Sequence, residues 1–362
     1  MEKIKKIAVV AVFVLTLFGI AAAHLLLPDE PLSAAERRKL AQAPEITAKA
    51  VFSGDYFEDV EKYLLDQFPG RQRFRAMKAI FRYQVLGMKD NNKLYQAEGH
   101  LMKLEPHVET AQIAMAVGRI NAMIDAHPEI AAAYYAVIPD KNYFLAAKNG
   151  YPAMDYEAML QQTSKIRGTY IDLFPHLTVE DYYRTDSHWR QDRILPVAQM
   201  LAQGMGVSID GVEAYTVETR PGFYGVYAGQ AALPVEPDTL AVMESDVTQD
   251  AVVTSVEHPD MKSVYTWEDF EGMDPYDVYL SGAEALLTLE NSHAANDRHL
   301  ILFRDSFGSS MAPLLLSGYS KVTVVDLRYI TSALVSQSVD FTDADVLFLY
   351  NTTMLNAGGT LK

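Results

Sequence analysis

The last seventy residues constrain the fold more than any other part of the chain. Short apolar, β-branched runs cover 298–306, 321–329 and 343–353, and a helical pattern fills 307–319 between the first two. Buried strands that alternate with helices indicate parallel βαβ units whose sheet is covered on both faces. The sequence therefore predicts an α/β fold with a parallel sheet flanked by helices.

Polar side chains follow these strands at the point where each one ends. Ser306 comes after the first strand, Asp326 to Arg328 after the second, and Asn351 at the end of the third. In open parallel sheets, ligands bind at the carboxyl ends of the strands. We therefore expect the functional site at this edge of the sheet.

Residues 1–27 have the pattern of a membrane segment. Lys3, Lys5 and Lys6 precede an uncharged run of 21 residues, Ile7 to Leu27. About 20 apolar residues cross a bilayer as a helix, and flanking lysines stay on the cytoplasmic side. The three alanines at 21–23 also fit a signal-peptidase site, so a cleaved signal stays open beside an anchor. We favour the anchor because the apolar run continues beyond them, and in either case residues 28 onward lie outside the cytoplasm.

Composition excludes several kinds of chemistry. There is no cysteine, which rules out disulfides, a cysteine nucleophile and thiolate-bound zinc. The histidines other than His188 show no metal-ligand spacing, and we expect neither a metal nor a cofactor. The chain carries a net charge of −16 and residues 1–27 carry +2, so residues 28–362 carry −18. Such an acidic chain argues against nucleic acid as a partner.

The middle of the chain divides into a stalk and one large domain. Residues 28–50 are polar and form the expected stalk, and 51–362 form the domain. Within it, 207–290 breaks into short strand-like runs, which we interpret as a β-rich excursion. The other expected elements are two amphipathic helices joined by Pro69-Gly70, a hairpin at 91–103, a strand at 131–141, and helices at 107–127, 153–168 and 190–205. Phe74, Met77, Phe81 and Val85 recur at helical spacing in the second amphipathic helix.

Ser306 is a candidate nucleophile because a buried strand ends there and a helix begins. The backbone N–H groups of Phe307 and Gly308 would lie at the helix N-terminus, where they could stabilise an oxyanion. The alternative is that Asp305 or Ser306 simply caps the helix.

Asp186 and His188 form a candidate pair for that serine. In an extended stretch, residues two apart point to the same face, so the carboxylate could orient the imidazole. The histidine would then deprotonate the serine. Taken alone the pattern is weak, and a histidine followed by Trp189 also fits a packed structural residue.

Several segments together resemble the DHHW family, which is related to the AlgX- and AlgJ-like proteins of alginate O-acetylation in the SGNH-hydrolase-like group. The resemblance runs from about residue 30 to the C-terminus. Its segments are "DYFEDVEKYLLDQFPGRQRFRAMKAIF", "LYQAEGHLM", "YYRTDSHW", "LFRDSFGSSMAPLL" and "VTVVDLRY". As in that group, Asp-x-His precedes the serine in the chain.

The resemblance implies an SGNH-hydrolase-like fold with Ser306 as nucleophile, His188 as general base and acid, and Asp186 as the residue that orients it. It also implies O-acetylation of an exported polysaccharide, with a membrane-bound O-acyltransferase supplying the acetyl group. Two positions depart from the family. Ser187 replaces a histidine, and we expect its side chain to point away from the Asp/His face. Ala283 stands in "YLSGAE" where the family usually has an amide, and Asn351 is a candidate substitute.

Other residues are weaker candidates for substrate binding. Arg328 could contact a sugar hydroxyl or a uronate, or form a salt bridge with Asp326 or Asp305. Tyr183 and Trp189 could offer a stacking surface for carbohydrate, although aromatic residues beside buried strands usually belong to the core.

Three functions remain open from the sequence. The first is a membrane-anchored O-acetyltransferase, and the second is a carbohydrate acetyl esterase with the same triad. They differ in whether a sugar hydroxyl or water resolves the acyl-enzyme. The third is a polysaccharide-binding or assembly scaffold with an impaired site, which Ala283 keeps open.

Overall fold

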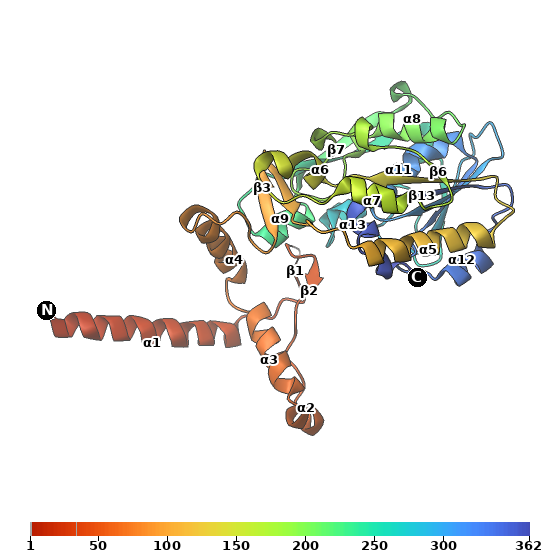
Figure 1. Ribbon diagram of the computed structural model, residues 1–362. Coiled ribbons are helices and arrows are strands. Elements are labelled where there is room, and N and C mark those ends of the chain that lie inside the picture. Colours follow the sequence, from red (N-terminus) through yellow and green to blue (C-terminus); the bar gives the residue numbers. More distant parts are fainter. Residues whose placement is uncertain (1, 34) are drawn as a thin grey trace. The chain divides into compact units, whose positions relative to one another are not determined.

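The computed structural model describes residues 2–33 and 35–362, which form two compact units (Figure 1). The first comprises Met1–Asn91 with Gly229–Pro234, and the second comprises Asn92–Ala228 with Val235–Lys362. The division therefore follows Asn91, whereas the sequence suggested a boundary after residue 50. The amphipathic helices before Asn91 belong to the first unit and not to the large α/β unit.

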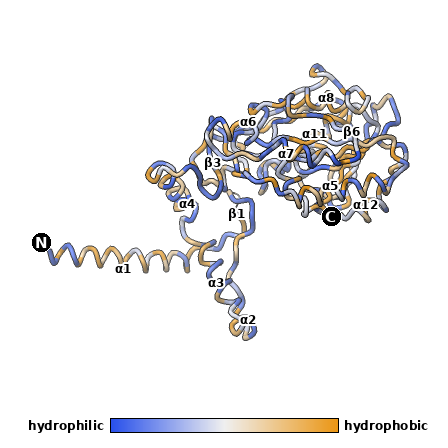
Figure 2. The backbone as a smooth tube through the Cα atoms, viewed as in Figure 1, coloured by the Kyte–Doolittle hydropathy of each residue, from blue (hydrophilic) through white to orange (hydrophobic). Residues whose placement is uncertain are grey.

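The first unit begins with a long apolar helix, α1 (Glu2–Leu26). By length and composition it could cross a membrane, and it is the one such helix among the described residues (Figure 2). The remaining elements include the two amphipathic helices that the sequence predicted around Pro69-Gly70. After α1, the elements of this unit are β1 (Leu32–Ser33), β2 (Arg38–Lys39), α2 (Ala48–Ser53), α3 (Asp55–Asp66), α4 (Arg71–Ile80) and the π-helical turn η1 (Phe81–Val85). The two predicted amphipathic helices are α3 and α4 with η1.

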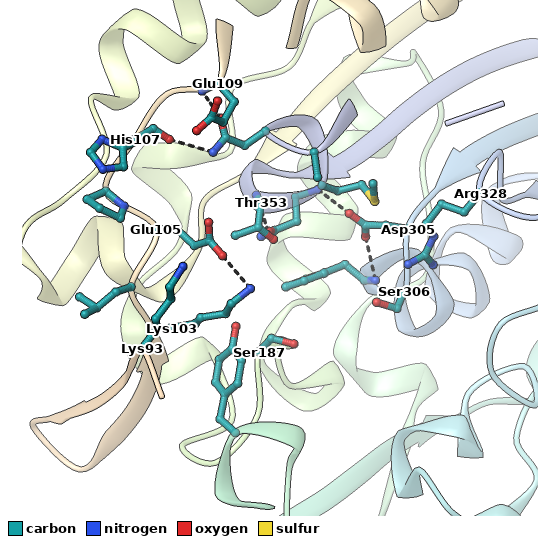
Figure 3. A pocket seen from close by; sticks show the side chains of 18 residues that line it. Lys93, Lys103, Glu105, His107, Glu109, Ser187, Asp305, Ser306, Arg328 and Thr353 are labelled. Carbon is teal, nitrogen blue, oxygen red and sulfur yellow. Dashed lines mark hydrogen bonds and ion pairs between the residues drawn. The ribbon is translucent and has the colours of Figure 1, made fainter. Parts of the chain in front are cut away.

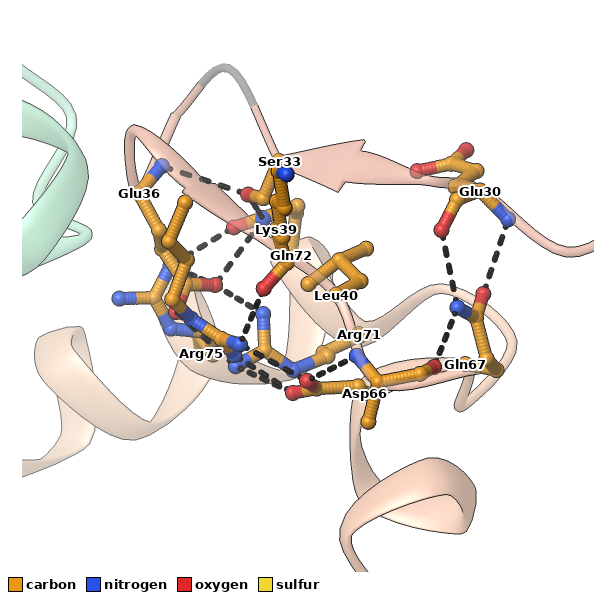
Figure 4. Close-up of polar contacts among 12 residues, drawn as sticks. Glu30, Ser33, Glu36, Lys39, Leu40, Asp66, Gln67, Arg71, Gln72 and Arg75 are labelled. Carbon is orange, nitrogen blue, oxygen red and sulfur yellow. Dashed lines mark hydrogen bonds and ion pairs between the residues drawn. The ribbon is translucent and has the colours of Figure 1, made fainter. Parts of the chain in front are cut away.

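Ion pairs join the β1–β2 hairpin to the helices of this unit (Figure 4). Glu36 accepts hydrogen bonds from Arg71 and from Arg38, the latter at 3.0 Å. Burial raises the pKa of Glu36, but these hydrogen bonds and the nearby Arg75 outweigh it and lower the pKa to about 2. Asp66 accepts a second hydrogen bond from Arg38 at 2.7 Å. Charge-assisted hydrogen bonds thus tie the hairpin to α3 and α4.

A seven-stranded sheet forms the centre of the second unit, in the order β6-β5-β13-β11-β12-β10-β9. The five strands from β6 to β12 are parallel, and β10 runs antiparallel to both of its neighbours. The strands are β5 (Ala132–Ile138), β6 (Thr169–Tyr170), β9 (Val252–Ser255), β10 (Leu286–Glu290), β11 (His299–Arg304), β12 (Lys321–Val325) and β13 (Asp345–Asn351). The parallel C-terminal strands and their order of appearance agree with the sequence prediction.

Helices cover both faces of this sheet (Figure 1). Leu300 and Leu302 of β11 pack in the cluster that contains α8 (Leu195–Gly204) and α11 (Phe307–Leu315). Ile301 and Phe303 point the other way, into the cluster of α5 (Thr110–Ala126), α7 (Tyr156–Thr163) and α12 (Ser332–Ser338). The strands read as continuous apolar runs because both faces are buried.

The remaining elements lie around the sheet. The predicted hairpin is present as β3 (Leu94–Ala97) and β4 (His100–Lys103). Only part of 207–290 is separate from the sheet, because β9 and β10 join it while β7 (Thr216–Phe223) and β8 (Asp238–Glu244) pair as their own ribbon. The other short α-helices among the described residues are α6 (Lys141–Leu145), α9 (Val226–Ala231), α10 (Asp246–Gln249) and α13 (Thr352–Leu355), and short 3-10 helices lie between the longer elements.

A fully buried ion pair links β11 to the end of β12. Arg304 and Asp326 both have no exposed side-chain surface, and Arg304 Nη1 lies 3.3 Å from Asp326 Oδ2. Arg304 also donates to the carbonyl of Gly282 at 3.3 Å. Burial lowers the pKa of Arg304, and Asp326 opposes that shift.

Replacing Asp326 by Asn should destabilise the protein strongly, since it leaves the Arg304 charge buried without its partner. We expect a loss of about 3–5 kcal/mol in the free energy of unfolding, measured by urea denaturation. The matched control is Asp125→Asn, which breaks the exposed pair between Arg167 and Asp125 and should cost less than about 1 kcal/mol. Equal losses in the two variants would contradict this role for the buried pair.

Candidate active site

Ser306 lies at the carboxyl edge of the sheet, where β11 passes into α11. It occupies the residue before the helix, with φ −59° and ψ −20°, and its side chain makes no capping hydrogen bond. The hydroxyl is therefore not consumed by the helix end and can serve another partner.

A tight loop at 182–189 carries the candidate acid and base. An isolated bridge pairs Tyr182 with Trp189, and the Tyr183 N–H donates to the His188 carbonyl at 3.0 Å. Within the loop, Asp186 Oδ1 accepts the backbone N–H of His188 at 3.0 Å. Asp186 and His188 thus face each other because the chain turns, whereas the sequence suggested an extended stretch.

The structure brings Asp186, His188 and Ser306 into one hydrogen-bonded chain. His188 Nε2 lies 2.7 Å from Ser306 Oγ, and His188 Nδ1 lies 2.6 Å from Asp186 Oδ1. An ionised carboxylate only accepts, so Nδ1–H is the donor and Nε2 is free to accept the serine proton. Asp186 is fully buried and also accepts the Val226 N–H at 2.7 Å. This is the arrangement in which an imidazole can deprotonate a serine.

Aromatic packing fixes the plane of the imidazole. The His188 ring stacks on Tyr276 with centroids 3.9 Å apart and planes 10° from parallel. The Tyr276 hydroxyl donates to Ser310 Oγ in α11, at 2.9 Å. Because Ser310 lies one helical turn after Ser306, this contact ties the base to the helix that follows the nucleophile.

Residues outside the loop hold the loop in place. Asp238, the first residue of β8, accepts the backbone N–H groups of Arg184 and Thr185 at 3.0 and 2.7 Å. Gly225 lies so close to Asp186 that an added Cβ would be 2.3 Å from the Asp186 Cβ. The β7–β8 ribbon therefore supports the triad loop, a role that nothing in its fragmented sequence pattern indicated.

The oxyanion donors that the sequence suggested are already occupied. The Phe307 N–H donates to Asp305 Oδ1 and the Gly308 N–H to the Asp305 carbonyl, both at 3.0 Å. Asp305 therefore caps the start of α11, which was the alternative interpretation. Among the described residues, no hydrogen bond engages the backbone N–H of Ser306.

A cavity of about 440 Å³ opens beside Ser306 (Figure 3). Lys103, Glu105, Arg328 and Ser187 contribute to its lining. The prediction that Ser187 points away from the site is wrong, because the turn of the loop brings its side chain to the cavity wall. Ala283 is exposed and is not among the described residues that line this cavity.

Arg328 and Asn351 both line the cavity, but their side chains already have different hydrogen-bond partners. Arg328 is bound to Asp326 through Nη2 at 2.5 Å, which confirms the expected salt bridge, and it still contributes to the cavity wall. The Asn351 amide donates to the Ile138 carbonyl at 3.1 Å, and its Oδ1 accepts the Thr353 N–H. Asn351 is thus committed as a helix cap, and its amide group does not replace the one missing at Ala283.

Tyr183 and Trp189 belong to the core, which contradicts their predicted role in stacking against carbohydrate. Both side chains are fully buried. The Trp189 indole donates to Ser310 Oγ at 2.8 Å, and the Tyr183 hydroxyl lies 3.4 Å from that of Tyr279. Neither lines the cavity.

Lys141 is a residue at this site that the sequence did not single out. It is buried at the start of α6, and its ammonium donates to the carbonyls of Tyr183 and Arg184 at 2.9 and 3.2 Å. Desolvation lowers the pKa of Lys141 to about 7, against the opposing effect of Asp186 and other carboxylates. No sequence signal marks it, because its neighbours in the loop are more than forty residues away.

Among the described residues, no group of three or more His, Cys, Asp or Glu side chains is arranged to hold a metal ion.

Comparison with known proteins defines the fold of this chain. No protein-family model matches it, and no curated protein matches it in sequence. Among solved structures, a DHHW family protein from Eubacterium siraeum aligns with a TM-score of 0.61 and 20% identity, over 74% of this chain and 93% of that one. Bacillus cereus PatB1 aligns with a TM-score of 0.59 and 18% identity, over 73% of this chain and 97% of that one.

The class of fold follows from these likenesses. The protein has the α/β architecture that the sequence predicted, a largely parallel sheet flanked by helices, and it shares its fold with a DHHW family protein and with PatB1. A further PatB1 structure, which carries a sulfonyl adduct, aligns with a TM-score of 0.58. The O-acetyltransferase domain of Pseudomonas putida AlgJ aligns more weakly, with a TM-score of 0.40 and 14% identity over 72% of this chain and 90% of that one.

Substituting Gly225 by Ala should disrupt the triad through a steric clash with Asp186. We expect labelling of Ser306 by an aryl sulfonyl fluoride to slow by about 100-fold, the cost typical of a 1 Å misplacement in an active site. Mass spectrometry follows the labelling, and circular dichroism checks the fold. The control is Gly118→Ala, since no atom lies within 4 Å of its added Cβ. Unchanged labelling in the Gly225 variant would show that the close approach is not required.

Lys141 should make the stability of the protein depend on pH. The unfolded lysine keeps its proton up to about pH 10.5 whereas the folded one loses it near 7, so the unfolded chain binds more protons between these values. The free energy of unfolding should therefore rise with pH across this window, by roughly 2 kcal/mol between about pH 7.5 and 9.5.

The test compares urea denaturation of wild type, Lys141→Met and the exposed-site control Lys165→Met at both pH values. The rise should disappear in Lys141→Met and persist in Lys165→Met. The same pH slope in all three proteins would refute the assignment.

Proposed function

We propose that this chain is a membrane-anchored, extracytoplasmic O-acetyltransferase. It moves an acetyl group through an acyl-Ser306 intermediate to hydroxyl groups of an exported polysaccharide. The observation that carries the proposal is the continuous hydrogen-bonded chain from Asp186 through His188 to Ser306, which ends at an open cavity.

In the first half-reaction, Ser306 Oγ attacks the acetyl carbonyl while His188 Nε2 takes its proton. The buried Asp186 carboxylate stabilises the imidazolium that results. When the tetrahedral intermediate collapses, the bond to the donor breaks and His188 returns the proton to the departing group. The acetyl group is then an ester of Ser306.

In the second half-reaction, a sugar hydroxyl takes the place of the donor group. His188 accepts the hydroxyl proton as the oxygen attacks the acyl carbon, and the same proton returns to Ser306 Oγ as the ester bond breaks. Water in place of the sugar would give hydrolysis, so the triad supports a carbohydrate acetyl esterase equally well. The resemblance of the triad segments to the DHHW and alginate O-acetylation proteins favours transfer.

The negative charge that develops in both steps needs hydrogen-bond donors. We assign this role to the backbone N–H of Ser306, because those of Phe307 and Gly308 are engaged by Asp305. The Arg328 guanidinium on the cavity wall adds positive charge nearby.

The N-terminal helix supports the proposed location. As an anchor, α1 would keep the protein beside a membrane-bound O-acyltransferase that supplies the acetyl group and beside the emerging polysaccharide. Residues 1–27 then act as the anchor, with 28 onward outside the cytoplasm.

The proposal predicts that turnover depends on all three triad residues. With a chromogenic acetyl ester, Ser306→Ala, His188→Ala and Asp186→Asn should each lower kcat by about 10⁴-fold or more, because they remove the nucleophile, its base, and the carboxylate that orients the base and stabilises its charged form, respectively. The control Ser164→Ala removes an exposed serine hydroxyl that bonds only within its own helix, and it should leave kcat unchanged.

An oligosaccharide acceptor separates the candidate functions. Acetylated oligosaccharide, detected by mass spectrometry, supports the transferase, whereas acetate alone supports the esterase. A folded wild-type protein that neither turns over the ester nor gains an acetyl group on Ser306 would overturn both in favour of a scaffold.

A further inference from the structure

The helix formed by α4 and η1 presents an exposed apolar stripe. Phe74, Met77, Phe81 and Val85 follow one another at spacings of three, four and four residues, so they share one face. Between 51% and 65% of each side chain is exposed. The opposite face packs inward, where Ala79 is fully buried. The stripe is thus largely exposed and not part of the core, although the Phe74 ring also meets the Phe68 ring edge-to-face, with centroids 5.4 Å apart.

Basic residues flank this stripe. Residues 71–85 contain five cations and no carboxylate, in a chain whose net charge is −16. The cations are Arg71, Arg73, Arg75, Lys78 and Arg82. Arg71 and Arg75 pair with Glu36 inside the first unit (Figure 4). Arg73 and Lys78 are exposed and lie four residues from Met77 and Phe74 respectively.

The neighbouring helix α3 has the opposite character. It also exposes apolar side chains, but it carries Asp55, Glu58, Asp59, Glu61 and Asp66 against a single lysine. An exposed apolar surface alone would not distinguish the two helices. Of the two helices, only that formed by α4 and η1 combines an apolar stripe with positive charge. This combination is complementary to a partner with an apolar interior and a negatively charged surface layer.

We propose that the helix 71–85 lies in the interface of an anionic lipid bilayer, with Phe74, Met77, Phe81 and Val85 in the acyl boundary and Arg73 and Lys78 at the headgroups. A basic amphipathic helix is the usual form of such an interfacial segment. Long cationic side chains can extend from the apolar boundary to the phosphate groups.

The same unit supplies the reason for choosing a membrane as the occupant. Its first helix, α1, is apolar enough to span a bilayer, so the residues that follow remain close to the bilayer surface. Juxtamembrane basic segments are attracted to anionic lipids over about a Debye length. A single span leaves the attached unit free to rotate, and the second contact restricts that rotation. The inference rests on the proposed anchorage but not on the proposed chemistry.

The absence of cysteine permits a direct test in the full chain. Phe81→Cys, and separately Met77→Cys, is labelled with a nitroxide and reconstituted into nanodiscs that contain phosphatidylglycerol and phosphatidylcholine. The control is Gln161→Cys, an exposed position on α7 of the second unit. Electron paramagnetic resonance then measures the accessibility of each label to oxygen and to a water-soluble nickel chelate.

We expect the labels at 77 and 81 to be severalfold more accessible to oxygen than to nickel, and the label at 161 to show the reverse. Replacing phosphatidylglycerol by phosphatidylcholine, or adding Arg73→Gln with Lys78→Gln, should reduce the oxygen preference at 77 and 81 toward the control. Two results would overturn the inference. Nickel-accessible labels at 77 and 81 would mean that the stripe faces water, and labels inaccessible to both reagents would mean that a second copy of the chain covers it.

This measurement contains no activity readout. Turnover of the chromogenic ester by the same labelled proteins reports separately on the triad, so failure of the membrane contact and failure of the proposed chemistry are distinguishable.

Discussion

The position of Ser306 depends on the two buried charged residues that precede it. Arg304 joins the end of β11 to Asp326 beyond β12, and Asp305 accepts the N–H of Asn351 at the end of β13, at 2.7 Å. The same Asp305 carboxylate accepts the first N–H of α11. The residues that connect β11 to α11 are thus bonded to the ends of both neighbouring strands, β12 and β13. Because buried charges are costly when unpaired, the arrangement tolerates few alternatives, and Ser306 is held at the edge with its hydroxyl left for His188.

The other half of the triad is built on a different principle. His188 and Asp186 lie in a loop whose geometry comes from contacts with distant segments: Asp238 holds its backbone N–H groups, and Lys141 holds its carbonyls. Donors and acceptors of the loop backbone are therefore satisfied by the half-buried Asp238 and the buried Lys141, as groups shielded from water require. Tyr276 connects the two halves of the triad. Its ring stacks on His188, and its hydroxyl donates to Ser310 in α11, so His188 is held within hydrogen-bond distance of Ser306.

This division explains how far the sequence could predict the molecule. Strands β11, β12 and β13 and the serine at their edge follow from local patterns, as do the hairpin at 94–103 and the paired helices around Pro69-Gly70. The failures involve side-chain partners that are remote in the sequence. The Phe307 N–H appeared free because the rotamer of Asp305 cannot be deduced from spacing. Ser187 was expected to face away because alternate residues of an extended strand point to opposite faces, whereas residues 182–189 form a turn.

Burial decided the remaining errors. Tyr183 and Trp189 were weak candidates for a sugar-stacking surface, with a place in the core as the alternative. The loop folds inward, and their polar atoms find partners in the core. Whether an aromatic residue beside a strand end faces a cavity or the core depends on packing from the β7–β8 ribbon and α11, which no local pattern reveals.

Ala283 illustrates how position changes the weight of a substitution. From the sequence, the missing amide kept open the hypothesis of an impaired site and hence of a scaffold. In the structure, the turn before Ala283 contains Leu280, Ser281 and Gly282 with positive φ, and it directs the Gly282 carbonyl to Arg304. The local backbone thus supports the buried ion pair that pins β11, and this contribution needs no side chain at position 283. Since Ala283 is exposed and lies outside the cavity lining, its departure from the family pattern leaves the hydrogen-bonded chain of the triad intact. Ala283 by itself therefore does not favour the scaffold hypothesis over an enzyme.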